Sequence, residues 1–244
     1  HSVLVLRTLI PWAVGLAIIS QFISYLGSGY LLSKVLALSK QFVKLLRSTI
    51  IVIGSASIGM IAGGMIGSSA AIFRWTSKSN NHPEGAFMAS ILPSLFNDLV
   101  LVVVSMFGLI HLLIVHKLSK TQLIGFISII LLLVFVIGLG IMSLRNREKA
   151  IAIGIKISTS MMHIIHKPID ITSYRKIFQD LFTSWDTLRS NTWQKPLSGA
   201  FINIIFDMLT LYFLFIAAGH RVSFGVLLTG YGLPLLLGKM AFMI

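Results

Sequence analysis

Residues 48–73 read STIIVIGSASIGMIAGGMIGSSAAIF and contain no Asp, Glu, Lys or Arg. Residues 8–33 and 121–144 are equally free of these charged types. Each stretch is longer than the ~20 residues that a helix needs to cross the hydrocarbon core of a bilayer. The sequence therefore predicts an all-α, polytopic integral membrane protein.

The composition of the chain supports the same class. Of its 244 residues, 56% are hydrophobic and 11% are charged, whereas a soluble domain is about one quarter charged. The mean hydropathy of +0.91 also excludes an ordinary soluble globule. The net charge is +13, from 20 Lys and Arg against 7 Asp and Glu. Because these cations flank the apolar runs, they indicate membrane orientation and affinity for anionic lipid, and not nucleic-acid binding.

The residue types of catalytic and metal centres are sparse. The chain has no Cys, which excludes disulfides, thiol nucleophiles and thiolate metal sites. The pairs His111 and His116, and His163 and His166, each lack a third ligand on the same face, so we expect no metal. No Ser, His and Asp occur in a recognisable catalytic pattern. We therefore expect no catalytic residue and no cofactor in this chain.

The Gly-rich stretch 49–73 has two interpretations. About one residue in three is Gly or Ser, and small residues allow helices to pack closely, so Gly59, Gly63 and Gly67 could form one face of a continuous helix. The alternative is a broken or re-entrant element that lines a site. The preceding basic stretch, 34–47, is predicted to form a short interfacial helix.

Four further apolar segments follow along the chain. They cover residues 86–115, 121–144, 197–219 and 222–244. Asp98 and Asp207 lie inside the first and third of them, and Pro234 interrupts the last. Together with 9–33 and 49–73, these segments predict five to six transmembrane or re-entrant helices.

The predicted organisation has three parts. Residues 1–144 form N-terminal membrane helices, 145–195 an amphipathic section, and 196–244 C-terminal membrane helices that end inside an apolar run. The middle part carries nine Lys and Arg, which predicts that it is cytoplasmic. Since the chain starts without Met, we expect that both ends are cut from a longer protein.

The distribution of cations also bears on the Gly-rich stretch. With 145–195 inside, a complete crossing by 49–73 would leave the cations of 34–47 outside, against the positive-inside rule. If 49–73 enters and returns, those cations lie inside. The topology therefore favours re-entry.

Two pairs of segments along the chain are similar in composition. An apolar span leads into a Gly-rich segment at 9–33 and 49–73, and again at 197–219 and 222–244. Interrupted hydrophobic segments at matching places in two halves are typical of transporter substrate sites. This similarity between the two pairs of segments predicts an inverted internal repeat.

Three stretches resemble a known family. They are GGMIGSSAAIFR (63–74), ASILPSLFNDLVLVVVSMFG (89–108) and FIAAGHRVSFGVLLTGYGLPLLLGKMAFMI (215–244). The pattern resembles the transmembrane domain shared by lysylphosphatidylglycerol synthase/flippase proteins and stand-alone flippase-like membrane proteins. This resemblance implies a multi-pass protein of the bacterial inner membrane that handles lipids. In the two-domain members, the lipid moved to the outer leaflet is aminoacylated phosphatidylglycerol.

The candidate lipid-headgroup site combines the acidic residues with the Gly-rich and Pro-containing elements. Its predicted members are Gly63, Gly64, Gly67, Arg74, Asp98, Asp207 and Pro234. Arg74 is either a snorkelling anchor or a ligand for a headgroup phosphate. A carboxylate inside hydrocarbon costs roughly 2.5 to 3.5 kcal/mol, so Asp98 and Asp207 must face the bundle or a wet path. They either line a polar path, where they contact a cationic headgroup, or hydrogen-bond to Asn97 or Asn203 between helices.

The sequence thus predicts translocation of a phospholipid between leaflets, with membrane lipids, anionic phospholipid above all, as partners. One alternative is the membrane half of an aminoacyl-phosphatidylglycerol synthase or of a lipid-linked glycan-modifying transferase. That protein would need a fused or partner soluble transferase domain, and a homo-oligomer is a further arrangement that the sequence leaves open. Another alternative is a structural or assembly-partner membrane protein.

Overall fold

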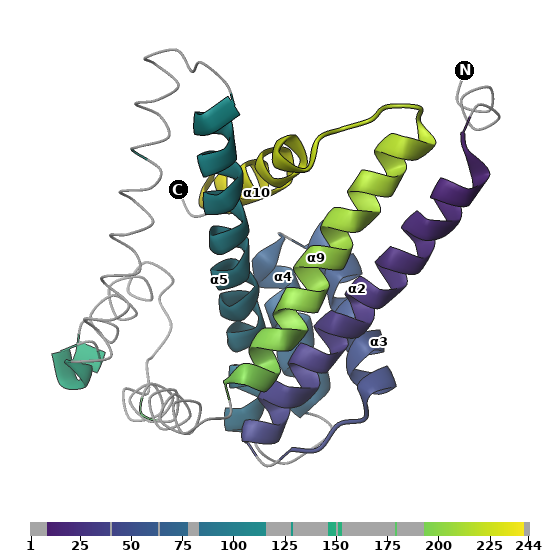
Figure 1. The fold of residues 1–244 in the computed structure, drawn as a ribbon. Helices are drawn as coiled ribbons and strands as arrows, with labels where there is room; N and C mark the ends of the chain where they lie inside the picture. The colour runs from purple at the N-terminus through teal and green to yellow at the C-terminus, as the bar shows by residue number, and fades with distance from the viewer. Residues whose placement is uncertain are drawn as a thin grey trace. The chain divides into compact units, whose positions relative to one another are not determined.

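The computed structural model describes residues 9–39, 41–62, 64–77, 83–115, 128, 146–149, 151–152, 179 and 193–241. The chain separates into two compact units, residues 1–118 with 193–244, and residues 119–192. The described part of the first unit is all helical (Figure 1). Its helices are α2 (Pro11–Leu38), α3 (Leu45–Ile61), α4 (Met65–Ser77), α5 (Pro83–Val115), α9 (Gln194–Ala217) and α10 (Phe224–Ala241). The predicted span 121–144 and almost all of the section 145–195 lie outside the described residues.

Three of these helices are long and apolar enough to cross a membrane. They are Pro11–Leu38, Gly85–Gly108 within α5, and Gln194–Ala217, with 28, 24 and 24 residues. At a rise of about 1.5 Å per residue, each exceeds the ~30 Å of a bilayer core. Helices α3 and α4 have 17 and 13 residues, and neither reaches that length.

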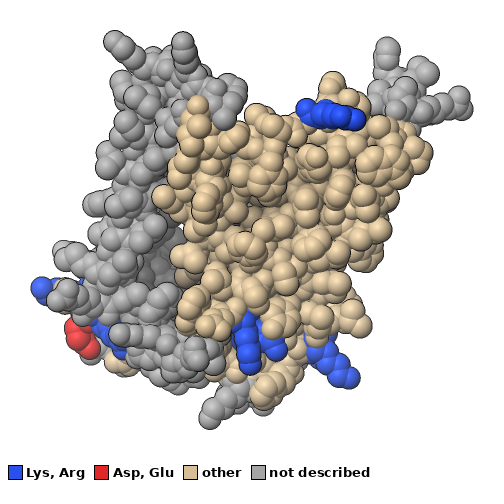
Figure 2. Space-filling model, viewed as in Figure 1, with Lys and Arg blue, Asp and Glu red and all other residues tan. Residues whose placement is uncertain are grey.

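The surface of the bundle is that of a membrane-embedded protein. Phe22 is 69% exposed and Met60 90% exposed, whereas Ser24 and Ser48 are buried. In the view of Figure 2, the blue Lys and Arg side chains of the tan face lie at its two ends, with an uncharged band between them. A surface that is apolar at mid-height and charged at its ends matches a lipid environment.

Helices α2 and α9 pack against each other in antiparallel orientation. The backbone N–H of Ile10, which precedes α2, donates to the carbonyl of Ala217 at the end of α9, at 3.0 Å. Further along, Gly27 lies against Asn203, and Gly199 lies against the backbone of Leu31. Small residues at the contact allow the two backbones to approach closely, as in other membrane helix pairs. Among the described helices, this pair makes the most extensive contact.

The Gly-rich stretch forms a helical hairpin. Helix α3 ends at Ile61, and α4 starts at Met65. Gly64 between them has φ +65°, a left-handed conformation that Gly adopts at no steric cost. Gly59 faces Ser68 across the hairpin. Of the two interpretations of this stretch, the continuous helix with one small face is therefore excluded, because the chain reverses at the turn. The broken element that was the alternative is present, and Gly63 itself lies outside the described residues.

The predicted interfacial helix over 34–47 was also wrong. Helix α2 continues through Lys34 to Leu38, and residues 41–44 are not helical. The reason is packing, because Leu32 and Leu36 form a buried cluster with Ile51 of α3 and Ala89 of α5. Because Leu32 and Leu36 are buried on either side of Lys34, this turn remains part of the helix.

The two remaining helices complete the bundle. Helix α5 accommodates Pro93 within its length, and α10, which contains Pro234, crosses the bundle at a steep angle to α5 and α9 (Figure 1). In the described residues, α2 is followed by a two-helix hairpin and α9 by α10 alone. The inverted repeat therefore stays a prediction.

Candidate functional site

Polar side chains gather at the mid-height of the three long helices. Each helix carries a pair within about one turn of its midpoint. The pairs are Gln21 and Ser24 on α2, Asn97 and Asp98 on α5, and Asn203 and Asp207 on α9. Side chains at bilayer depth must find partners within the protein, because lipid tails offer none.

Asp207 is held by donors from two other helices. The Gln21 Nε2 donates to Asp207 Oδ1 at 3.3 Å, and the Tyr231 hydroxyl donates to Asp207 Oδ2 at 2.7 Å. Both donors are neutral, and among the described side chains no Lys or Arg forms an ion pair with this carboxylate. The side chain of Lys239 on α10 lies outside the described residues. Helices α2, α9 and α10 therefore meet at one carboxylate.

Asn203 links three helices one turn before Asp207. The Ser24 hydroxyl lies 2.9 Å from Asn203 Oδ1 and 3.1 Å from the Asn203 backbone carbonyl. The Asn203 Nδ2 donates to Asn97 Oδ1 at 3.2 Å. Interhelical hydrogen bonds of this kind hold membrane helices together. The two asparagines named as candidate partners for the acids thus pair with each other.

Asp98 lies beside this bridge on α5. It is half-buried, and Ser94 on the preceding turn of the same helix donates to its Oδ2 at 3.4 Å. Because Asn97 is bonded to Asn203, Asp98 and Asp207 lie on neighbouring helices that this amide pair joins. Two of the predicted site residues are thereby brought to the same level of the bundle.

The other predicted site residues lie on other elements. Arg74 is exposed in the last turn of α4, Gly64 and Gly67 lie at the tip of the hairpin, and Pro234 is exposed on α10. The hydrogen bonds of Asp207 come from Gln21 and Tyr231 and from none of these four.

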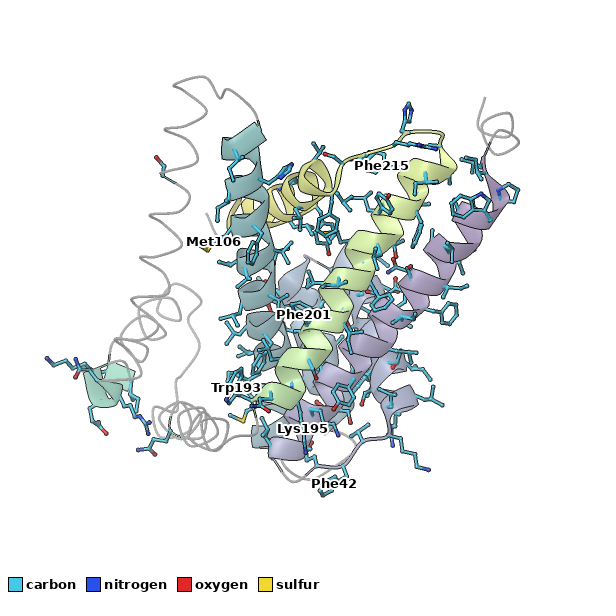
Figure 3. All side chains as sticks on the ribbon, viewed as in Figure 1. Phe42, Met106, Trp193, Lys195, Phe201 and Phe215 are labelled. Atoms are coloured by element: carbon cyan, nitrogen blue, oxygen red, sulfur yellow. The ribbon has the colours of Figure 1, made fainter. Side chains whose placement is uncertain are left out.

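Arg74 belongs instead to a group of cations at one end of the bundle, which we term the basic end. This end contains the C-termini of α2 and α4 and the N-termini of α3 and α9. Its described cations are Lys34, Lys44, Arg47, Arg74 and Lys195. Figure 3 shows Lys195 and Phe42 at this end and Phe215 toward the other. The opposite end carries the described cation Arg221.

Three members of the site, Gln21, Ser24 and Tyr231, were not predicted from the sequence. Gln21 could have been found, because it is the single amide side chain in the uncharged stretch 8–33. Ser24 resembled any small residue of a packing face. Tyr231 stood between glycines, and its partner is 24 positions away on another helix.

Comparison of the chain with protein-family models, with curated proteins and with solved structures finds no match. In the described residues, no three His, Cys, Asp or Glu side chains are grouped so that they could hold a metal ion. The structural basis for inferring a function is therefore the set of polar side chains at the mid-height of α2, α5 and α9, together with Tyr231 of α10.

Proposed function

We propose that this chain is a flippase-like membrane protein that moves a phospholipid between the two leaflets. The polar headgroup passes the level of Asp98 and Asp207, while the acyl chains stay in the surrounding lipid. Aminoacylated phosphatidylglycerol is the candidate substrate that the family resemblance implies, and the bacterial inner membrane is the implied location.

One observation carries the proposal, namely a carboxylate at mid-membrane depth that neutral donors hold. Burying an acidic side chain at that depth is energetically unfavourable, so such side chains face a water-filled path or a polar partner. A structural clamp needs no charge, since amides and hydroxyls already join α2, α5 and α9 through Ser24, Asn97 and Asn203. The additional carboxylate of Asp207 offers negative charge that a cationic group in transit can bind.

The hairpin and the basic end support the same function. Helices α3 and α4 each fall short of a bilayer crossing, so a hairpin that enters from one face and returns fits their lengths. That arrangement places the cations of α3 and α4 with Lys34 and Lys195 on one side. By the positive-inside rule this side is cytoplasmic, and Arg74 there is suited to hold a headgroup phosphate.

A structural role is the second candidate, and a specific observation favours it. Both oxygens of Asp207 already accept hydrogen bonds from side chains of packed helices. In this case the carboxylate would act as a clamp between α2, α9 and α10, with no passage of a headgroup.

The substitution Asp207→Asn separates the two candidates. The variant and the wild type are reconstituted in vesicles with a fluorescent phospholipid, and leaflet exposure is followed by quenching with dithionite. Translocation predicts at least about a ten-fold loss of rate with little change in thermal stability, since one interaction with a charged group amounts to about 1.5 to 3 kcal/mol. The clamp predicts lower thermal stability, because an amide offers one acceptor oxygen to the two donors Gln21 and Tyr231. It also predicts a rate that falls only as far as the folded fraction does.

The matched control is Thr210→Val, one turn further along α9. The Thr210 hydroxyl donates to the carbonyl of Phe206 in its own helix at 2.9 Å, so its loss leaves the contacts between helices intact. Translocation in this variant should equal that of the wild type. Equal rates in wild type, Thr210→Val and Asp207→Asn, with all three folded, would remove Asp207 from the mechanism.

A further inference from the structure

Helix α10 packs mainly on α5 and meets α9 in few places. Gly225 lies against the His111 ring, and Gly232 lies against Ser105, both on α5. Figure 1 shows α10 crossing the other helices rather than running alongside them. Its attachment to α9 therefore depends on a small number of contacts.

The sequence of α10 also makes it a weak helix. Gly225, Gly230 and Gly232 each lower helix stability relative to Ala, and Pro234 does so more strongly. Pro234 has no N–H, so it cannot donate to the carbonyl of Gly230 one turn earlier. A helix of this composition needs tertiary contacts to keep its position.

Tyr231 provides the contact that joins α10 to α9. Its side chain is only 7% exposed, and its hydroxyl donates to Asp207 Oδ2 at 2.7 Å. Hydrogen bonds to ionised groups are among the stronger ones in proteins. While this bond is intact, Tyr231 occupies one of the two carboxylate oxygens, and Gln21 occupies the other at 3.3 Å.

We propose that Tyr231 is a positioning residue that latches α10 over Asp207. When the bond opens, α10 moves away from α9 and remains on α5. The movement frees Asp207 Oδ2, an acceptor that suits a headgroup with an ammonium or a hydroxyl donor. The ligand class rests on the proposed function, whereas the latch can be tested without it.

The test measures distances between spin labels in the full chain, in lipid nanodiscs. The chain has no Cys, so a pair of introduced thiols is labelled without background. One pair replaces Leu214 on α9 and Leu235 on α10, which are 48% and 41% exposed. The reference pair replaces Phe22 on α2 and Phe201 on α9, also exposed, and reports whether α2 and α9 stay together.

The substitution Tyr231→Phe removes the latch and keeps the ring. We expect a second, longer Leu214–Leu235 distance, with the ratio of open to closed forms raised on the order of ten-fold, and an unchanged reference pair. The matched control, Tyr212→Phe, removes the same hydroxyl from α9 and should leave both distances as in the wild type. Identical distributions for Tyr231→Phe and Tyr212→Phe would overturn the proposal, and so would equal broadening of both pairs.

Failure of the latch and failure of the proposed function give different results. Asp207→Asn keeps one acceptor oxygen for Tyr231 and removes the charge, so the latch predicts a smaller shift of the α9–α10 distance in that variant than in Tyr231→Phe. If Tyr231→Phe lengthens the α9–α10 distance while the Asp207→Asn variant transports lipid normally, the result supports the latch and contradicts the translocation role of Asp207. If Asp207→Asn abolishes transport while Tyr231→Phe leaves the α9–α10 distance unchanged, the result contradicts the latch and supports the translocation role.

Discussion

The close approach of α2 and α9 predicts that a single methyl group at Gly27 will separate them. A Cβ built on Gly27 lies 2.7 Å from the backbone nitrogen of Asn203 and 3.1 Å from the carbonyl oxygen of Gly199. Favourable contacts between such atoms begin at roughly 3.5 Å. Because the neighbouring atoms belong to the backbone of another helix, they cannot rotate away. Gly27→Ala must therefore push the two helices apart by about 0.8 Å, the difference between this contact distance and 2.7 Å.

The expected loss of stability has two parts. Overpacking a filled contact costs about 1 to 3 kcal/mol. The same displacement stretches the bond from the Ser24 hydroxyl to Asn203 Oδ1, now 2.9 Å, beyond hydrogen-bonding distance, and such a bond contributes about 0.6 kcal/mol or somewhat more between membrane helices. The free energy of unfolding should fall by about 2 to 4 kcal/mol relative to a variant that gains the methyl group without the clash.

Gly15→Ala on the same helix is that variant. A Cβ at Gly15 meets no atom within 4 Å, and both variants gain the same helix propensity, about 1 kcal/mol. Unfolding by SDS in mixed micelles, followed by Trp fluorescence and far-ultraviolet circular dichroism, compares the two. Gly27→Ala unfolding at the same SDS fraction as Gly15→Ala, or a higher one, would refute the reasoning.

Two further predictions concern the hairpin turn and the orientation of the bundle. Gly64 has φ +65°, so Gly64→Ala should lower the free energy of unfolding by about 1 to 2 kcal/mol and Gly64→Asn by less, because Asn tolerates this conformation better. Equal SDS midpoints for Gly64, its Ala variant and its Asn variant would contradict a left-handed turn. For the orientation, Phe42→Cys at the basic end and His220→Cys at the opposite end place one exposed thiol each in a Cys-free chain. A membrane-impermeant maleimide should label the His220→Cys variant in intact cells and the Phe42→Cys variant in inside-out vesicles, and the reverse pattern would contradict a cytoplasmic basic end.

The free energy of transfer from water to hydrocarbon depends on the local composition of a segment. For this reason the membrane-spanning segments could be predicted from the sequence. The charge-free run 8–33 predicts a membrane helix wherever its neighbours lie, and α2 occupies this region. The same holds for 86–115 and 197–219, which correspond to α5 and α9. The acids Asp98 and Asp207 were also recognisable, because an ionisable residue within an apolar run is conspicuous at any position.

Partners and chain reversals depended on residues that are far apart in sequence, so only the tertiary structure determined them. Composition could not tell whether 49–73 crosses or turns back, and the turn became visible only through Gly64 and the contacts of Gly59 across it. Likewise, Asp207 is bonded to Gln21, 186 positions away in the chain, and to Tyr231. Hydrophobicity specifies the depth of a residue in the bilayer, whereas which helices face one another depends on close backbone contact between small residues, and this requires the folded arrangement.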